Sequence, residues 1–136
     1  MKALAPIVYI VDDDRAVRSV LKRLLTKAGY QLWDTGDPDA AIRRFTESSP
    51  SERPALILTD VIMPAMTGMR MIDQIAKAGT DVRVIYMSGH VQSQISQEGT
   101  SGAVVEFLEK PIKTELLLAA VDRVLQGVAS PPERTV

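Results

Sequence analysis

The stretch Leu56-Ile57-Leu58-Thr59-Asp60-Val61-Ile62-Met63-Pro64 decides the fold that we expect for this chain. Three large apolar residues open it, which is typical of a strand buried on both faces of a parallel sheet. Asp60 then stands at the end of this strand, just before a turn that contains Pro64. An ionised carboxylate in such a place costs free energy unless something pairs with it. Asp60 is therefore a candidate either for chemistry or for a cap.

Four further apolar runs predict strands, and amphipathic patterns separate them. The runs lie at residues 7–11, 30–35, 82–87 and 103–108. Between them, apolar residues recur at every third or fourth position, which predicts helices with one buried face. In the first of these helices the basic residues share the opposite, solvated face: Arg18, Lys22, Arg23 and Lys27. Residues 91–102 give the weakest helical pattern, because they are rich in Gln, Ser and Gly.

Capping residues mark the ends of the predicted helices. Asp14, Asp37 and Thr114 stand where N-cap side chains would accept hydrogen bonds from the first turn. Gly29 and Gly79 follow the first and third helical patterns and suit helix ends. Residues 48–51 form a polar run, which predicts a loop before the central strand.

The regular alternation of strand and helix predicts an α/β fold. Parallel pairing with right-handed crossovers would produce a doubly wound, three-layer sandwich around a five-stranded parallel sheet, and the order 2-1-3-4-5 suits five strands. We expect residues 1–126 to form one domain. Residues 127–136 contain Pro131-Pro132 and no apolar pattern, which predicts a C-terminal tail or linker.

Composition and charge exclude several kinds of protein. The chain has 136 residues, no cysteine and a net charge of −1. Disulfides, thiolate metal sites and a cysteine nucleophile are excluded, and the charge gives no reason to expect direct binding to nucleic acid or to a membrane. No run approaches the roughly 20 apolar residues of a membrane span. The first residues are too few for a signal peptide, so we expect a cytoplasmic protein.

Polar side chains stand at the carboxyl ends of four predicted strands. They are Asp12 and Asp13, Asp60, Ser88, and Lys110. In the order 2-1-3-4-5 the first, third and fourth strands are neighbours, and function in such sheets lies outside the carboxyl ends. We therefore expect these side chains to share one pocket. Asp34 and Thr35, at the end of the run 30–35, receive no role.

Three carboxylates in one pocket favour a hard cation and phosphoryl transfer. At about 5 Å they repel one another by a few kcal/mol per pair, taking an effective dielectric constant near 20. Oxygen ligands of this kind suit Mg²⁺ or Mn²⁺. Lys110 and the cation would neutralise a phosphoryl group, Ser88 would donate a hydrogen bond to it, and Asp60 would attack as the nucleophile.

Taken together, these motifs resemble the receiver domain of two-component response regulators, of the chemotaxis-regulator kind. They are Asp12-Asp13, Asp60 with Met63-Pro64 and Gly68, Ser88-Gly89, and Phe107 with Lys110-Pro111. The resemblance covers about residues 7–126. Each motif alone is weak, but all of them occur in the family's order and at predicted strand ends. The fold that the resemblance implies is flavodoxin-like, in agreement with the order 2-1-3-4-5.

The resemblance implies a role for each acid. Asp60 would be the phosphoacceptor, and the donor would be a histidine kinase or a histidine phosphotransfer protein. Mg²⁺ would be bound by Asp13, Asp60 and the backbone carbonyl of Ile62, with Asp12 acting largely through water. Lys110 would pair with Asp60 before phosphorylation and with the phosphoryl group afterwards.

The resemblance also implies a switch. Ser88 would move toward the phosphoryl group, Phe107 would rotate inward, and the Lys110–Pro111 bond would be cis. The output surface would be the fourth helix, fifth strand and fifth helix, about residues 91–126, which would bind a downstream protein or form a homodimer on phosphorylation. The protein would catalyse only its own phosphorylation and dephosphorylation, as a signalling switch and not a turnover enzyme.

Other interpretations remain open for the chain and for single residues. It could be an adaptor that keeps the fold and binds partners without phosphorylation. It could be an aspartate-nucleophile phosphatase, although that family has a second Asp where Ile62 stands. A flavin-binding protein would need a phosphate loop where this chain has three acids. Taken singly, Ser88 suits a turn, Lys110 a solvated loop and Phe107 the core.

Overall fold

The sheet has the predicted strand order. The computed structural model describes residues 5–78, 82–89 and 105–127. In these residues, parallel strands pair in the order β2-β1-β3-β4-β5. The strands are β1 (Ile7–Val11), β2 (Gln31–Thr35), β3 (Leu56–Asp60), β4 (Val84–Ser88) and β5 (Val105–Glu109).

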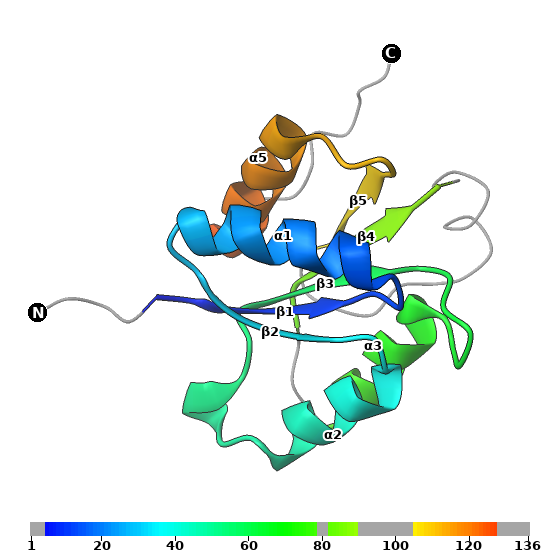
Figure 1. Ribbon diagram of the computed structural model, residues 1–136. Helices are drawn as coiled ribbons and strands as arrows, with labels where there is room; N and C mark the ends of the chain where they lie inside the picture. Colours follow the sequence, from blue (N-terminus) through cyan, green and yellow to red (C-terminus); the bar gives the residue numbers. More distant parts are fainter. Residues whose placement is uncertain (1–4, 79–81, 90–104, 128–136) are drawn as a thin grey trace, which may run out of the picture.

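Helices cover both faces of the sheet, which confirms the three-layer sandwich. Figure 1 shows α1 (Arg15–Lys27) and α5 (Thr114–Leu125) on one side, and α2 (Pro38–Glu47) and α3 (Gly68–Ala76) on the other. The polar run 48–51, predicted as a loop, overlaps a short 3₁₀ helix, η1 (Pro50–Glu52). Among the described residues, none of the helices is both long and apolar enough to cross a membrane.

The central strand β3 is buried throughout, as its apolar run predicts. Leu56 and Leu58 pack in the core between the sheet and the layer of α1 and α5, whereas Ile57 packs in the core beneath α2 and α3. Successive side chains of a strand point to opposite faces, so a run of apolar residues fills both cores. This burial fixes the end of β3, and with it Asp60, in the middle of the sheet.

Most of the predicted caps are present, and one is wrong. Asp14 accepts hydrogen bonds from the amides of Ala16 and Val17 and caps α1. Asp37 accepts from Asp39 N and caps α2. Gly29 follows α1 with φ +102°, a conformation that favours glycine. Thr114, however, is the first residue of α5, because the extended backbone ends at Lys113, whose side chain makes no capping hydrogen bond.

The last two strands begin and end later in the chain than the apolar runs 82–87 and 103–108 predict. β4 begins at Val84, opposite Ile57, and β5 reaches Glu109, opposite Ser88. Val82 is buried but precedes the ladder. The difference arises because backbone hydrogen bonds to a neighbour define a strand, whereas apolar residues can be buried outside it. Residues 103 and 104, the helical pattern at 91–102 and Gly79 lie outside the described residues.

Candidate functional site

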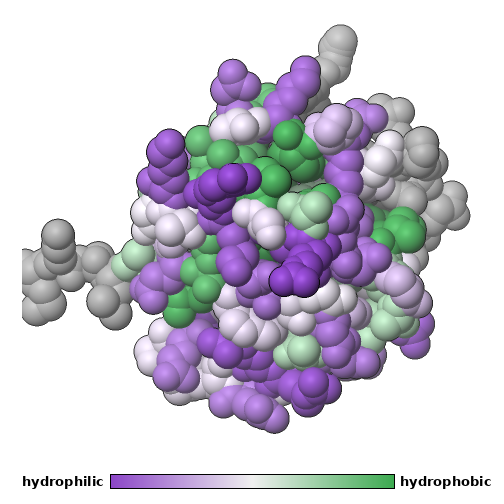
Figure 2. Space-filling model, viewed as in Figure 1, coloured by the Kyte–Doolittle hydropathy of each residue, from purple (hydrophilic) through white to green (hydrophobic). Residues whose placement is uncertain are grey.

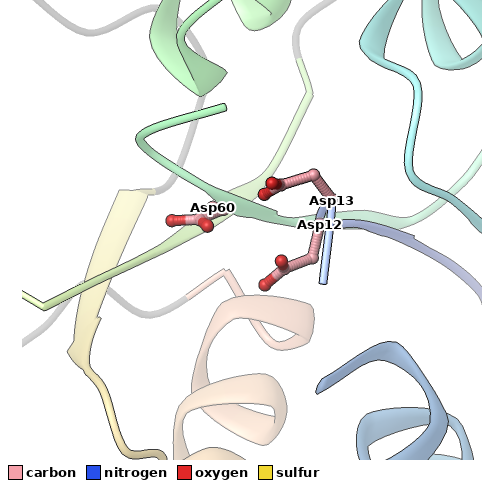
Figure 3. Close-up of side chains that lie close together, drawn as sticks. All are labelled: Asp12, Asp13 and Asp60. Atoms are coloured by element: carbon pink, nitrogen blue, oxygen red, sulfur yellow. The ribbon is translucent and has the colours of Figure 1, made fainter. Parts of the chain in front are cut away.

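The carboxylates of three aspartates converge at the carboxyl edge of the sheet. One oxygen each from Asp12, Asp13 and Asp60 lies within 4.8 Å of the others. Figure 3 shows Asp12 and Asp13 extending from the end of β1 toward Asp60 at the end of β3. The strands are direct neighbours and Val11 pairs with Thr59, so Asp12 and Asp60 occupy the next positions along the two strands. The structure thus brings together the three acids that the strand ends predict.

Asp12 is fully buried and bonded at both carboxylate oxygens. Oδ1 accepts from the backbone amide of Asp14 at 2.9 Å, and Oδ2 accepts from Lys110 Nζ at 2.9 Å. Burial raises the pKa of the Asp12 carboxyl above its ordinary value, although the bonds from Asp14 and Lys110 act against this rise and the charge of Asp60 adds to it. With both oxygens already engaged, Asp12 suits an outer, water-mediated contact with a cation.

Lys110 joins two of the acids. Its Nζ lies 2.9 Å from Asp12 Oδ2 and 3.0 Å from Asp60 Oδ2, and its side chain is 24% exposed. Burial works to lower the pKa of Lys110, but the hydrogen bonds and charges of the two carboxylates together outweigh it and raise the pKa. The backbone of Lys110 is fixed at the carboxyl edge of the sheet, since Lys110 N donates to Ser88 O at 2.8 Å. This places the side chain beside the acids. The Lys110–Pro111 bond is cis.

Asp60 is 8% exposed, and one of its oxygens is only weakly engaged. Oδ2 accepts from Lys110, whereas the single bond that Oδ1 accepts from the described residues is a long one, 3.4 Å from Ile62 N. The turn after Asp60 returns so closely that a Cβ on Gly68 would overlap the carbonyl oxygen of Asp60. Gly68, singled out in the sequence as a motif residue, therefore owes its place to this close approach.

Ser88 and Phe107 lie on the two strands beyond β3. Ser88 ends β4, pairs with Glu109 and is 2% exposed. Phe107 is partly buried and stacks on Tyr86, with ring centroids 5.4 Å apart and an interplanar angle of 19°. Ser88 follows Met87, the residue opposite Asp60, so its hydroxyl belongs to the same edge as the acids. Phe107 instead lies along the sheet, beside Tyr86.

The donor set fits a hard divalent cation such as Mg²⁺. All three side chains offer carboxylate oxygens, which these ions prefer. Asp13 is exposed, and its carboxylate makes no hydrogen bond with any described residue, so its oxygens are available to a ligand. In the described ranges, three acids face one ammonium group, that of Lys110, which leaves a surplus of negative charge. The carbonyl of Ile62 stays a predicted ligand.

Sequence reasoning missed a second group of charges beside the acids. Asp34, at the end of β2, accepts from Arg18 Nε at 2.9 Å and forms an ion pair with Lys22 at 3.2 Å. The prediction that Arg18 is solvated is wrong, because its side chain is only 18% exposed. Its Nη1 donates to the backbone carbonyl of Asp12 at 2.7 Å. An acid at the end of the strand beside β1, opposite a basic helix face, is the signal that could have found it.

Comparisons with known proteins agree with this geometry. The sequence profile of the family described as response regulator receiver domain matches residues 8–122. The DNA-binding transcriptional regulator NtrC of Azospirillum brasilense is 31% identical over 93% of this chain and 26% of its own length. The transcriptional regulatory protein FixJ of Azorhizobium caulinodans is 32% identical over 84% of this chain and 52% of its own length. The chain thus spans about a quarter to a half of these relatives.

Solved structures share the fold. The receiver domain of the hybrid histidine kinase CckA superposes with a TM-score of 0.71 at 30% identity, covering 88% of this chain and 99% of that one. A receiver domain protein from Clostridium thermocellum has a TM-score of 0.76 at 23% identity, covering 89% and 94%. The second likeness speaks for the fold alone.

Proposed function

This chain belongs to the family of response regulator receiver domains, and from that premise we propose that it accepts a phosphoryl group on Asp60 in two-component signalling. The observation that carries the proposal is the position of Lys110, which holds one oxygen of Asp60 beside a cluster with surplus negative charge. Within the described part of the chain, the other oxygen of Asp60 has one weak partner, Ile62 N, and it can act as the nucleophile.

The proposed reaction divides its work among a few side chains. Asp60 Oδ1 forms a bond to phosphorus as the bond from phosphorus to the donor's histidine nitrogen breaks, and the histidine leaves with the bonding electrons. Lys110 keeps Asp60 in place through Oδ2, and its ammonium group lies where it can neutralise the phosphoryl oxygens. Asp13 and Asp60, the carbonyl of Ile62, and Asp12 through water would hold Mg²⁺, whose charge would stabilise those oxygens.

An apolar groove beside Lys110 suits the phosphodonor, which we propose is a histidine kinase or a histidine phosphotransfer protein. The groove runs between α1 and the loop from β5 to α5, and its apolar lining is Ala16, Val17, Val20, Leu21, Leu24, Pro111 and Ile112. Val20 is 45% exposed, and Figure 2 shows apolar surface (green) among hydrophilic side chains on this face. Apolar surface rimmed by charge is typical of protein interfaces.

We propose that phosphorylation is read through Ser88 and Phe107, with Ser88 moving toward the phosphoryl group. Phe107, stacked on Tyr86, would follow it and alter the surface formed by residues 91–126. A downstream protein or a second copy would bind there. In this proposal residues 1–126 form the receiver domain and residues 127–136 a tail or linker. The chain acts as a switch in the cytoplasm and transforms no substrate other than its phosphodonor.

The test is phosphorylation by a small-molecule donor. The protein is incubated with acetyl phosphate and Mg²⁺, and its intact mass is measured. We expect a gain of one phosphoryl group in the wild type and none in Asp60→Asn. Asp39→Asn, which changes an exposed acid of α2, should keep the gain.

Two results would overturn the proposal. A phosphoryl group retained in Asp60→Asn would move the nucleophile to another residue. A wild-type protein that gains no mass from acetyl phosphate and also fails to bind beryllofluoride would instead be an adaptor that works without phosphorylation.

A further inference from the structure

The side chain of Arg18 connects the second strand to the backbone of the acid pair. From the first turns of α1, Nε donates to Asp34 Oδ2 at 2.9 Å and Nη1 donates to the carbonyl oxygen of Asp12 at 2.7 Å. The guanidinium group has a rigid planar fork, so its two bonds hold Asp34 and the Asp12 carbonyl at a set separation. Arg18 is thus a brace between β2 and the end of β1.

The carbonyl of Asp12 controls where the next side chain points. It belongs to the peptide unit between Asp12 and Asp13, and this unit is planar. Rotating the carbonyl therefore rotates the amide of Asp13 and swings the Asp13 carboxylate. The Asp12 side chain has its own restraints, from Asp14 and Lys110. The Asp13 carboxylate has none among the described residues, so its direction depends on the backbone.

The surroundings of Arg18 are shaped to let it reach this carbonyl. A Cβ on Gly36 would lie 2.8 Å from Arg18 Nη1 and 3.5 Å from the carbonyl oxygen of Asp12. Only a residue without a side chain leaves room for the guanidinium group at this point. Gly36 therefore leaves the space that the brace needs.

We propose that Arg18 is a positioning residue for the metal site, which orients the Asp13 carboxylate toward Asp60 by holding the Asp12 carbonyl. The inference rests on the proposed function, because it assumes that Asp13 binds Mg²⁺. Arg18 itself touches neither the cation nor the phosphoryl group. It acts through the peptide unit, as outer residues at metal sites do when they orient the direct ligands.

Electrostatics and positioning predict opposite effects for the loss of Arg18. A cation near three carboxylates weakens the binding of another cation, so removing its charge should tighten Mg²⁺ binding if charge is all that matters. If Arg18 positions Asp13, removing it should weaken Mg²⁺ binding despite the lost repulsion. The sign of the change therefore separates the two roles.

The experiment measures Mg²⁺ affinity by NMR titration of the backbone amides at constant ionic strength. We expect Arg18→Met to bind Mg²⁺ about tenfold more weakly than the wild type. Lys22→Met is the matched control: it removes the same charge from the same partner, Asp34, without touching the Asp12 carbonyl. Its affinity should equal or slightly exceed that of the wild type.

Two further variants keep the positive charge. Gly36→Ala retains Arg18 but displaces its guanidinium group, so it should weaken Mg²⁺ binding in the same direction. The displaced atom is the end of a flexible side chain, so this variant should melt close to the wild type without metal. Arg18→Lys has one ammonium group in place of the fork and should not restore wild-type affinity. If Arg18→Met does not fold, Gly36→Ala decides the question.

The outcomes separate this inference from the proposed function. Unchanged or tighter Mg²⁺ binding in Arg18→Met, or in Gly36→Ala if the former is unfolded, would overturn the positioning role and leave the proposed function intact. A wild-type protein that shows no amide shifts with Mg²⁺ at millimolar levels would overturn both, because the acid cluster would then hold no cation.

Discussion

Two carboxylates in this protein, Asp12 and Glu106, are almost equally buried, but the charged groups around them differ. Glu106 is 2% exposed and is matched by Arg123 of α5, whose Nε and Nη2 each donate to one of its oxygens at 2.8 Å. Asp12 is fully buried and shares Lys110 with Asp60, while Asp13 adds a third acid. Glu106 and Arg123 form a neutral ion pair, here called the closed pair. Asp12, Asp13 and Asp60 form an open acid cluster, which carries surplus negative charge even with Lys110 beside it.

This difference separates a structural ion pair from a functional site. The two parallel bonds between Arg123 and Glu106 satisfy both groups, so nothing more is needed to balance them. The negative charge of the acid cluster is balanced only when a cation binds to it, so the cluster is suited to bind a ligand. A buried acid therefore indicates a functional site when its negative charge is not balanced by a neighbouring cation. Burial alone does not indicate one.

The largest effect should come from removing Lys110, the one cation among the described residues that contacts a carboxylate of Asp12, Asp13 or Asp60. Lys110→Met should slow phosphorylation by acetyl phosphate about 100-fold, because Asp60 loses the donor that holds it and the phosphoryl oxygens lose a positive charge. The rate is followed by intact mass. Lys113→Met, a change at an exposed neighbouring lysine, should leave the rate unchanged. A rate in Lys110→Met within a few-fold of the wild type would show that the cluster does not depend on this cation.

Breaking the closed pair should instead cost stability. Arg123→Met leaves Glu106 buried without its partner and should lower the free energy of unfolding by about 2 kcal/mol, less than for a fully buried pair because Arg123 is 38% exposed. Urea denaturation measures the loss. The double variant Glu106→Leu/Arg123→Met should recover most of it. A single variant as stable as the wild type would mean that the pair is screened by solvent.

Removing an acid from the open cluster should have the opposite sign. Asp13→Asn relieves repulsion from Asp12 and Asp60 and breaks no hydrogen bond to a described residue. We expect the free energy of unfolding without Mg²⁺ to rise, by less than about 1 kcal/mol because Asp13 is exposed. Mg²⁺ should stabilise the wild type more than this variant. A loss of metal-free stability in urea denaturation would contradict the idea of surplus charge.

The smallest effect concerns Asp34 and pH. Burial acts to raise the pKa of Asp34, but Arg18 and Lys22 prevail and hold it below its ordinary value of 3.8. A lowered folded-state pKa contributes stability that is full above pH 3.8 and is lost as the pH falls through the folded-state value. Asp34→Asn should therefore be less stable than the wild type at pH 6, and the gap should narrow at pH 3. A gap that does not change with pH in urea denaturation would refute this.

Much of the site could be predicted from sequence, because its residues follow strands whose burial is plain. The apolar runs before Asp12 and Asp60 place both acids at the carboxyl edge of a parallel sheet, and the strand order then brings them together. The brace of Arg18 and the pair of Glu106 with Arg123 could not be predicted in this way. Periodicity identifies the face on which a residue lies, but it does not show which charge from a distant segment lies opposite.

The amino-acid sequence by itself determined the order of strands and helices, the two cores around Leu56, Ile57 and Leu58, and the set of groups at the carboxyl edge. These follow from local hydrophobic period and from the chirality of crossovers, which need no knowledge of distant contacts. Only the tertiary structure decided that Lys110 bridges two acids and that Arg18 reaches the backbone between Asp12 and Asp13. Long side chains choose partners by distance and available space, and both are set only when separate strands and helices pack.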